Sequence, residues 1–117
     1  MDEGSAVDRS RRLAIVLTTV ASKAAAEDLV RTLVGERLIA CGNILPGVLS
    51  LYQWEGRLTR EEEVLILMKV PGADVERLFG RITELHPYTV PELIEVPVDG
   101  VSRAYCRWVI ESTEVSA

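Results

Sequence analysis

The chain has 117 residues, of which 48% are hydrophobic, and its formal net charge is −5. This length predicts a single domain, and no apolar run approaches the roughly 18 residues that a membrane-spanning helix needs. The negative charge argues against a nucleic-acid partner. A small domain with this apolar content is predicted to bury part of its surface against other copies of itself.

The chain starts with a polar segment before its first apolar run. Residues 1–11 contain no apolar stretch typical of a secretion signal, so they are predicted to form a flexible tail ahead of a single domain over residues 12–117. The two cysteines, Cys41 and Cys106, lie far apart and have neither disulfide nor zinc spacing. This cysteine usage favours a reducing cytoplasm.

The first strand and helix follow directly. Leu13 to Val20 is apolar and β-branched, which predicts a strand covered on both faces. Ser22 is an N-cap candidate for a helix that continues to about Leu38. The apolar stripe of this helix consists of Ala26, Leu29, Val30, Leu33 and Val34.

A long hairpin is predicted next. Its first strand begins near Ile39, is interrupted at Pro46-Gly47 and continues to Trp54. Glu55-Gly56 predicts a compact turn, and the returning strand runs from about Arg57 to Val70.

The last third of the chain predicts a helix, a strand and a second helix. After Pro71-Gly72, an apolar stripe with helical spacing consists of Val75, Leu78, Phe79, Ile82 and Leu85. Pro87 ends that helix, and Leu93 to Val98 predicts a short fourth strand. Ser102 is an N-cap candidate for a terminal helix on which Tyr105, Trp108 and Val109 share a face.

The element order is βαββαβ plus a C-terminal helix, which predicts an α+β, ferredoxin-like antiparallel sheet with strand order 4-1-3-2. The prolines agree, because Pro46 and Pro97 fall in the second and fourth strands, the two edges of that order. The third strand sends apolar side chains to both faces, from Val64 to Met68, whereas two helices cover only one face. We therefore expect a neighbouring subunit on the other face.

Three ordered segments resemble one known family. The first comprises Ala40-Cys41-Gly42-Asn43-Ile44-Leu45-Pro46-Gly47, then Ser50-Leu51-Tyr52-Gln53-Trp54-Glu55-Gly56-Arg57, with Glu63 and Lys69. The second comprises His86-Pro87-Tyr88, Pro91-Glu92 and Pro97, and the third comprises Gly100, Tyr105 and Trp108. In order and spacing these segments resemble the CutA divalent-cation-tolerance family, over nearly everything after the tail.

The resemblance implies a homotrimer with an architecture like that of the PII signal proteins, a link to copper and divalent-cation tolerance, and a cytoplasmic location. The chain departs from the family pattern at three positions. Gly42 replaces a residue that is commonly β-branched, Arg57 replaces lysine, and Val70 replaces the threonine of many members. The change at Val70 removes a hydroxyl beside a possible anion or ligand site.

The candidate metal ligands are Cys41, His86 and Glu92. A thiolate and an imidazole suit copper, although a strong site normally has three or four ligands at recognisable spacing. The topology places Cys41 and His86 at opposite ends of the sheet, so they are expected to meet only across a subunit boundary. Copper or another divalent cation is therefore expected to bind weakly. The structural alternative is a buried Cys41, and a His86 that interacts with the carbonyls ending its helix.

The candidate ligand-binding residues are Lys69, Tyr88, Tyr52, Trp54, Tyr105 and Trp108. Scarce aromatic residues that gather in this way line a pocket or anchor an interface, and the interface is the favoured interpretation. Lys69 ends an apolar strand and is expected to have a carboxylate partner such as Glu92, or to contact an anionic ligand. Residues 61–63, three glutamates near the turn, are expected to be solvated.

No familiar catalytic motif occurs: there is no G-x-S-x-G, P-loop, H-E-x-x-H or Rossmann glycine pattern, so the chain is not predicted to be an enzyme. The leading hypothesis is a homotrimer in divalent-cation homeostasis with weak metal binding between subunits. The alternatives are a PII-like sensor that binds a small anion in intersubunit clefts, and a scaffold that presents three equivalent surfaces to unknown protein partners.

Overall fold

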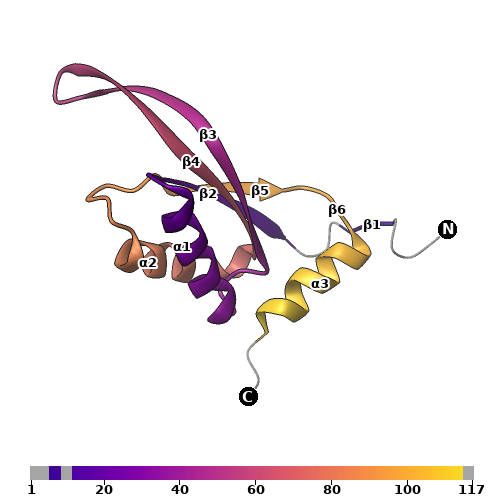
Figure 1. Cartoon of the computed structure of the whole chain (residues 1–117). Helices are drawn as coiled ribbons and strands as arrows, with labels where there is room; N and C mark the ends of the chain where they lie inside the picture. The colour runs from indigo at the N-terminus through magenta and orange to yellow at the C-terminus, as the bar shows by residue number, and fades with distance from the viewer. Residues whose placement is uncertain (1–5, 9–11, 115–117) are drawn as a thin grey trace.

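A four-stranded antiparallel sheet forms the centre of the protein (Figure 1), as seen in a computed structural model that describes residues 6–8 and 12–114. The strands are β1 Val7–Asp8, β2 Leu13–Val20, β3 Cys41–Trp54, β4 Arg57–Pro71, β5 Ile94–Val98 and β6 Val101–Ser102. The helices are α1 Lys23–Gly35, α2 Val75–Leu85, preceded by the 3-10 turn Gly72–Asp74, and α3 Arg103–Thr113. Among the described residues, no helix combines the length and apolar character needed to cross a membrane.

The sheet order is β3-β4-β2-β5, which confirms the predicted ferredoxin-like arrangement. The two strands with an internal proline, β3 with Pro46 and β5 with Pro97, lie at the edges, whereas Pro71 is the last residue of the central strand β4. The register of β3 against β4 shifts between Leu45 and Val48, where Gly47 has a positive φ of 79°. The interruption predicted at Pro46-Gly47 is therefore a bulge within one continuous edge strand.

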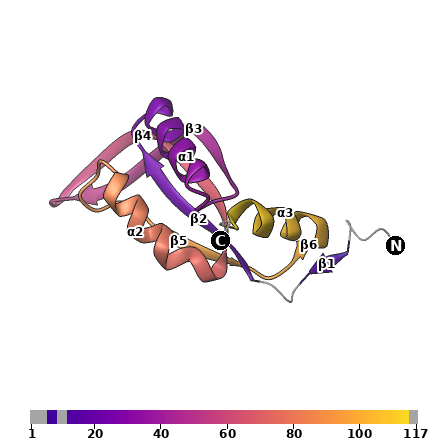
Figure 2. The same cartoon turned by 90° about the horizontal axis from the view of Figure 1, so that it is seen from below.

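Helices α1 and α2 cover one face of this sheet (Figure 2). The predicted stripes supply their buried residues, Ala26, Leu29 and Leu33 from α1 and Val75, Leu78 and Ile82 from α2. These side chains meet the even-numbered residues of the central strands, from Ala14 to Val20 and from Val64 to Val70. Ser22 accepts a hydrogen bond from the N–H of Ala25, which confirms the predicted N-cap.

Helix α1 is shorter than predicted: it ends at Gly35 rather than near Leu38. Arg37 adopts a positive φ of 61°, a left-handed conformation that cannot continue a helix. The N–H groups of Glu36 and Arg37 instead donate to carbonyls of the last turn, and Leu38 packs into the core from outside the helix.

The second face of the sheet is only partly covered. Helix α3 lies over one end, where Cys106 and Val109 pack against Leu13 and Ala40. Apart from Thr19, Asn43 and Lys69, the rest of this face is apolar, with half-buried residues in the two central strands and exposed residues in the edge strands. The exposed members are Leu45 at 39%, Ile94 at 47% and Val96 at 41%. We call this surface the open face.

The β3-β4 hairpin extends well beyond the helices (Figure 1), and the chain measures 53 Å along its longest axis. Its turn uses positive φ angles at Glu55 (51°) and Gly56 (77°), as a tight two-residue hairpin requires. Beyond the bulge, alternation separates two surfaces. Exposed leucines on one surface are Leu49, Leu51 and Leu58, and the other surface carries Tyr52, Trp54, Glu61 and Glu63.

Part of the predicted tail is a strand. Val7 and Asp8 pair antiparallel with Ser102 and Val101, and Ala6 accepts a hydrogen bond from the N–H of Arg103. This two-residue pairing was not predicted. The other residues of the predicted tail, 1–5 and 9–11, lie outside the described residues.

A buried hydroxyl leads to a stability prediction. Thr18 is fully buried on the helix-covered face, and its Oγ1 has no hydrogen-bond partner among the described residues. Thr18→Val replaces this hydroxyl with a methyl of similar size, so it is expected to raise the free energy of unfolding by about 1 kcal/mol, measured by chemical denaturation. Thr113→Val is the matched control, because the buried Thr113 hydroxyl donates to the Val109 carbonyl. An equal gain in both variants would contradict an unsatisfied group at Thr18.

Candidate functional site

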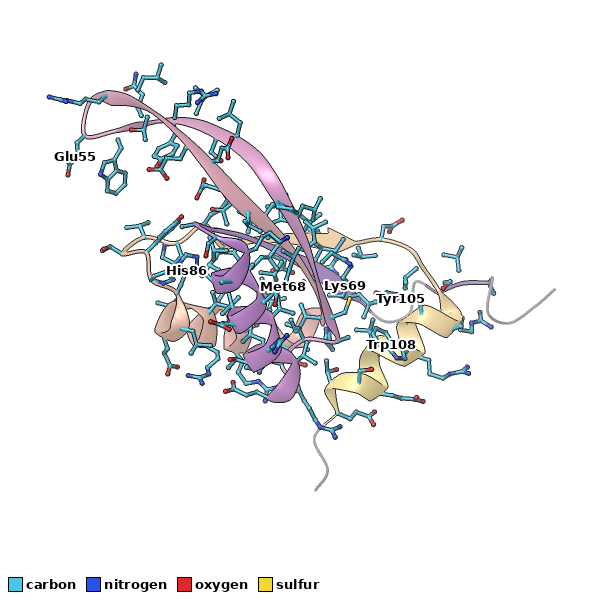
Figure 3. The ribbon with its side chains drawn as sticks, in the orientation of Figure 1. Glu55, Met68, Lys69, His86, Tyr105 and Trp108 are labelled. Carbon is cyan, nitrogen blue, oxygen red and sulfur yellow. The ribbon has the colours of Figure 1, made fainter. Side chains whose placement is uncertain are left out.

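The candidate site residues separate into two groups at opposite ends of the sheet. Tyr52, Trp54, Tyr88 and Glu92 line a groove beside the hairpin. Cys41, Lys69, Tyr105 and Trp108 lie at the other end, beside α3, where Figure 3 shows the last three of these residues on the side away from His86. Glu63 of β4 lies in the first group, bonded to Tyr88, and Lys69 of β4 lies in the second. Six residues of strand separate them, which corresponds to about 20 Å.

The first group forms what we call the hairpin groove. It has a volume of about 490 Å³ and lies between β3, β4, the end of β2 and the loop that precedes β5. Its lining residues are Thr19, Tyr52, Trp54, Thr59, Glu61, Glu63, Pro87, Tyr88, Thr89, Val90 and Glu92. Three of them are carboxylates, and the described lining contains no lysine or arginine. The groove is therefore both acidic and aromatic.

Glu63 is the buried carboxylate of this groove. Only 7% of the residue is exposed, and its Oε2 accepts a hydrogen bond of 3.0 Å from the hydroxyl of Tyr88. Burial, followed by this bond to Glu63, raises the pKa of Tyr88 to about 12. The expectation that all three glutamates of residues 61–63 are solvated is wrong for Glu63. Strand alternation places Glu63 on the same side as Leu65 and Leu67, and that signal was overlooked.

Tyr52 and Trp54 line the groove from β3. They lie across from Thr59 and Arg57 in the register of the hairpin, on the surface that also carries Glu61. Burial and a hydrogen bond to Glu61 raise the pKa of Tyr52. The Tyr88 hydroxyl is therefore a protonated donor to the Glu63 carboxylate at neutral pH.

His86 lies below the groove and is buried, with both ring nitrogens occupied. Nε2 is 2.8 Å from the carbonyl oxygen of Thr19, and Nδ1 accepts a hydrogen bond of 3.1 Å from the N–H of Tyr88. Because a carbonyl only accepts, this pattern requires the neutral tautomer protonated at Nε2. The ring contacts β2 rather than the carbonyls that end α2, although the backbone N–H of His86 caps Ile82. Ligation of a metal by His86 would require one of these bonds to break.

The second group, which we call the α3 cluster, centres on a thiol. The half-buried Cys41 has its Sγ 3.6 Å from the hydroxyl of Tyr105, whose ring lies 5.6 Å from that of Trp108. Burial and the hydrogen bond to Cys41 raise the pKa of Tyr105 to about 12. Lys69 pairs with Cys41 in the strand register and donates to Oδ1 of Asn43, not to Glu92 as expected.

The metal-ligand candidates do not converge within one chain. Cys41 belongs to the α3 cluster, whereas Glu92 lines the hairpin groove and His86 lies below it. Across residues 6–8 and 12–114, no three His, Cys, Asp or Glu side chains form a group able to hold a metal ion. This geometry agrees with the expectation that Cys41 and His86 are separated within a protomer.

Comparisons with known proteins agree with the fold and the motifs. The CutA1 divalent ion tolerance protein family matches residues 14–112. The divalent-cation tolerance protein CutA of Thermus thermophilus is 41% identical over 99 residues, 85% of this chain and 96% of that protein. The corresponding protein of Pyrococcus horikoshii is 43% identical over 100 residues, 86% of this chain and 97% of that protein.

Solved structures of CutA proteins have the same fold as this chain. CutA from Synechococcus elongatus superposes with a TM-score of 0.92 at 29% identity, covering 97% of this chain and all of that one. The Thermus thermophilus protein superposes with a TM-score of 0.83 at 40% identity, covering 87% of this chain and 99% of that one. With the sheet order, the hairpin and the ordered motifs in agreement, this chain belongs to the CutA1 divalent ion tolerance protein family.

Proposed function

We propose that this protein acts in divalent-cation tolerance as a cytoplasmic homotrimer, without a catalytic role, and binds copper or another divalent cation weakly at sites shared between subunits. The relatives from Thermus and Pyrococcus carry divalent-cation tolerance in their names. The observation that carries the proposal is the open face, an apolar sheet surface with a half-buried thiol, Cys41, beside it.

Two apolar surfaces support association. The open face exposes Leu45, Ile94 and Val96, and the hairpin exposes Leu49 and Leu51 some distance away. Surfaces of this kind mark protein–protein contacts. A contact that joins two different surfaces is head-to-tail, and such contacts form a ring when the rotation between subunits closes. A three-membered ring is the assembly implied by the family.

Metal binding in this assembly is expected to be weak for a structural reason. Cys41 is a soft ligand suited to copper, but the described part of one chain provides no second and third ligand around it. Glu92 and His86 can reach Cys41 only from another copy, and His86 has both nitrogens engaged. A site assembled in this way has few ligands and must displace existing hydrogen bonds.

The test combines solution mass with copper titration. Sedimentation is expected to give three times the chain mass, and calorimetry to show saturable Cu(I) or Cu(II) binding at one or fewer ions per subunit. Cys41→Ser is expected to weaken this binding about tenfold or more, whereas Cys106→Ala, which removes the buried thiol, is expected to leave it unchanged. A stable monomer would overturn the trimer, and copper binding insensitive to Cys41→Ser would overturn the metal site.

A second candidate function is a sensor that binds a small molecule, and the hairpin groove favours it. The sequence suggested an anionic ligand held by Lys69 and Tyr88. Tyr88 donates to Glu63 of β4, which is six residues and about 20 Å of strand rise from Lys69, and the groove beside Tyr88 is lined by carboxylates. The charge of the groove supports a cationic ligand instead of an anionic one.

A further inference from the structure

We propose that the hairpin groove is a binding site for a small organic cation, a metabolite that presents an ammonium or guanidinium group. This inference deepens the second candidate function and is independent of copper binding. It rests on a buried carboxylate with unused hydrogen-bonding capacity, on aromatic walls, and on the spacing of the three acidic side chains.

The buried carboxylate is Glu63. It is more than nine-tenths buried, yet no ion pair joins it to a lysine or arginine within the described chain. Its Oε2 accepts from the neutral Tyr88 hydroxyl, while Oε1 has no donor among the described residues. Glu63 lines the groove, and its Oε1 is not among the fully enclosed unpartnered side-chain atoms of the described residues. A buried carboxylate is costly without a counter-charge, and the groove is where a counter-charge fits.

The walls suit an organic cation. The rings of Tyr52, Trp54 and Tyr88 line the same groove as Glu63 and Glu61. Aromatic faces attract ammonium and guanidinium groups, with tryptophan the strongest, and the attraction grows as the cation loses water. The volume of about 490 Å³ lies within the range of small-molecule sites.

The spacing of the acids argues against a bare metal ion. Glu61, Glu63 and Glu92 all line the groove, but they do not form a group close enough to hold a metal within the described residues. A hard divalent cation needs about six oxygen ligands at 2.0–2.6 Å. An organic cation has no such requirement, because its N–H donors or its diffuse positive charge can interact with carboxylates that are several ångströms from one another.

Trp54 provides the measurement. In a Trp108→Phe background it is the only tryptophan in the sequence, and it lines the groove. Its emission is followed while choline or agmatine is added to the intact assembly, with dimethylbutanol, the uncharged carbon isostere of choline, as the neutral probe. We expect a saturable change with at least one cation and none with the isostere. The absence of saturable binding with both cations, or equal binding of the isostere, would overturn the proposal.

A matched pair of variants tests the role of Glu63. Glu63→Gln retains an acceptor for Tyr88 but removes the charge, and is expected to weaken cation binding about tenfold. Glu62→Gln removes the same charge from the exposed opposite surface of the hairpin and is expected to change affinity less than about twofold. Equal losses would show a general charge effect and overturn the site. If Glu63→Gln fails to fold, Glu61→Gln takes its place.

The same titrations separate this inference from the metal proposal. Cation binding is expected to persist in Cys41→Ser, because Cys41 lies in the α3 cluster. Copper binding is expected to persist in Glu63→Gln. Loss of copper binding in that variant would place copper in the groove. Loss of cation binding in Cys41→Ser, with binding retained in Glu63→Gln, would place the cation at the α3 end and overturn the assignment to the groove.

Discussion

His86→Ala is expected to lower the free energy of unfolding by about 3 kcal/mol, with or without metal present. The substitution removes the partner of the buried Thr19 carbonyl and of the half-buried N–H of Tyr88. Each unsatisfied buried group costs about 1–3 kcal/mol, and the lost ring also leaves a cavity. Denaturation at fixed protein concentration, with and without a chelator, measures the effect.

Two conservative variants divide this loss between the two hydrogen bonds of His86. The amide oxygen of His86→Asn reaches the position of Nδ1 and can accept from Tyr88, whereas the amide nitrogen of His86→Gln reaches the position of Nε2 and can donate to Thr19. Each is expected to cost about half as much as alanine. If alanine, asparagine and glutamine are all neutral once a chelator is added, His86 is a metal ligand and its structural role is contradicted.

The fold was largely predictable from sequence because it rests on local signals. Apolar runs, the internal prolines of two strands and the Glu55-Gly56 turn identified every strand of the main sheet and its order. The pairing of β1 with β6 was not predicted, because each strand has two residues and too little length for any periodic pattern. The end of α1 was misplaced because the left-handed Arg37 is not a glycine.

The sequence identified most residues of the candidate site, but not how they are arranged or which partners they have. Tyr52, Trp54, Tyr88 and Glu92 were singled out, and the structure brings them to one groove. The partners that define their chemistry come from distant strands, and sequence spacing does not identify such partners. Glu63 illustrates this, because it lies in a run of three glutamates that resembles solvated charge, yet alternation turns it inward.

Lys69 and His86 show the same limit for polar partners. Lys69 was expected to pair with a carboxylate and instead donates to Asn43, on the neighbouring strand two positions away in register. His86 was expected to cap its own helix and instead reaches Thr19, 67 residues earlier in the chain. Both partners depend on how strands align, so they follow from the assembled sheet and not from the local sequence.

Gly42→Val, which introduces the β-branched side chain common in the family, is expected to lower the free energy of unfolding by about 1–3 kcal/mol. A Cβ at position 42 would lie 2.8 Å from Cγ2 and 3.1 Å from Cγ1 of Val30, on α1. Overpacking of this kind displaces side chains and backbone. Valine in a helix has one strongly preferred rotamer, so Val30 cannot easily turn aside. In this chain Gly42 and Val30 therefore form a matched pair that sets how closely α1 approaches β3.

A double-mutant cycle tests that pairing. Val30→Ala alone removes partly buried methyl groups and is expected to cost about 1 kcal/mol. The combination with Gly42→Val fills the vacated space and replaces a glycine in a strand, where glycine is unfavourable. The double variant is therefore expected to be more stable than Gly42→Val alone, with a coupling energy of at least about 1 kcal/mol by denaturation. Additive losses would mean that residue 42 and α1 do not compete for space, and that the family's β-branched residue is excluded here for another reason.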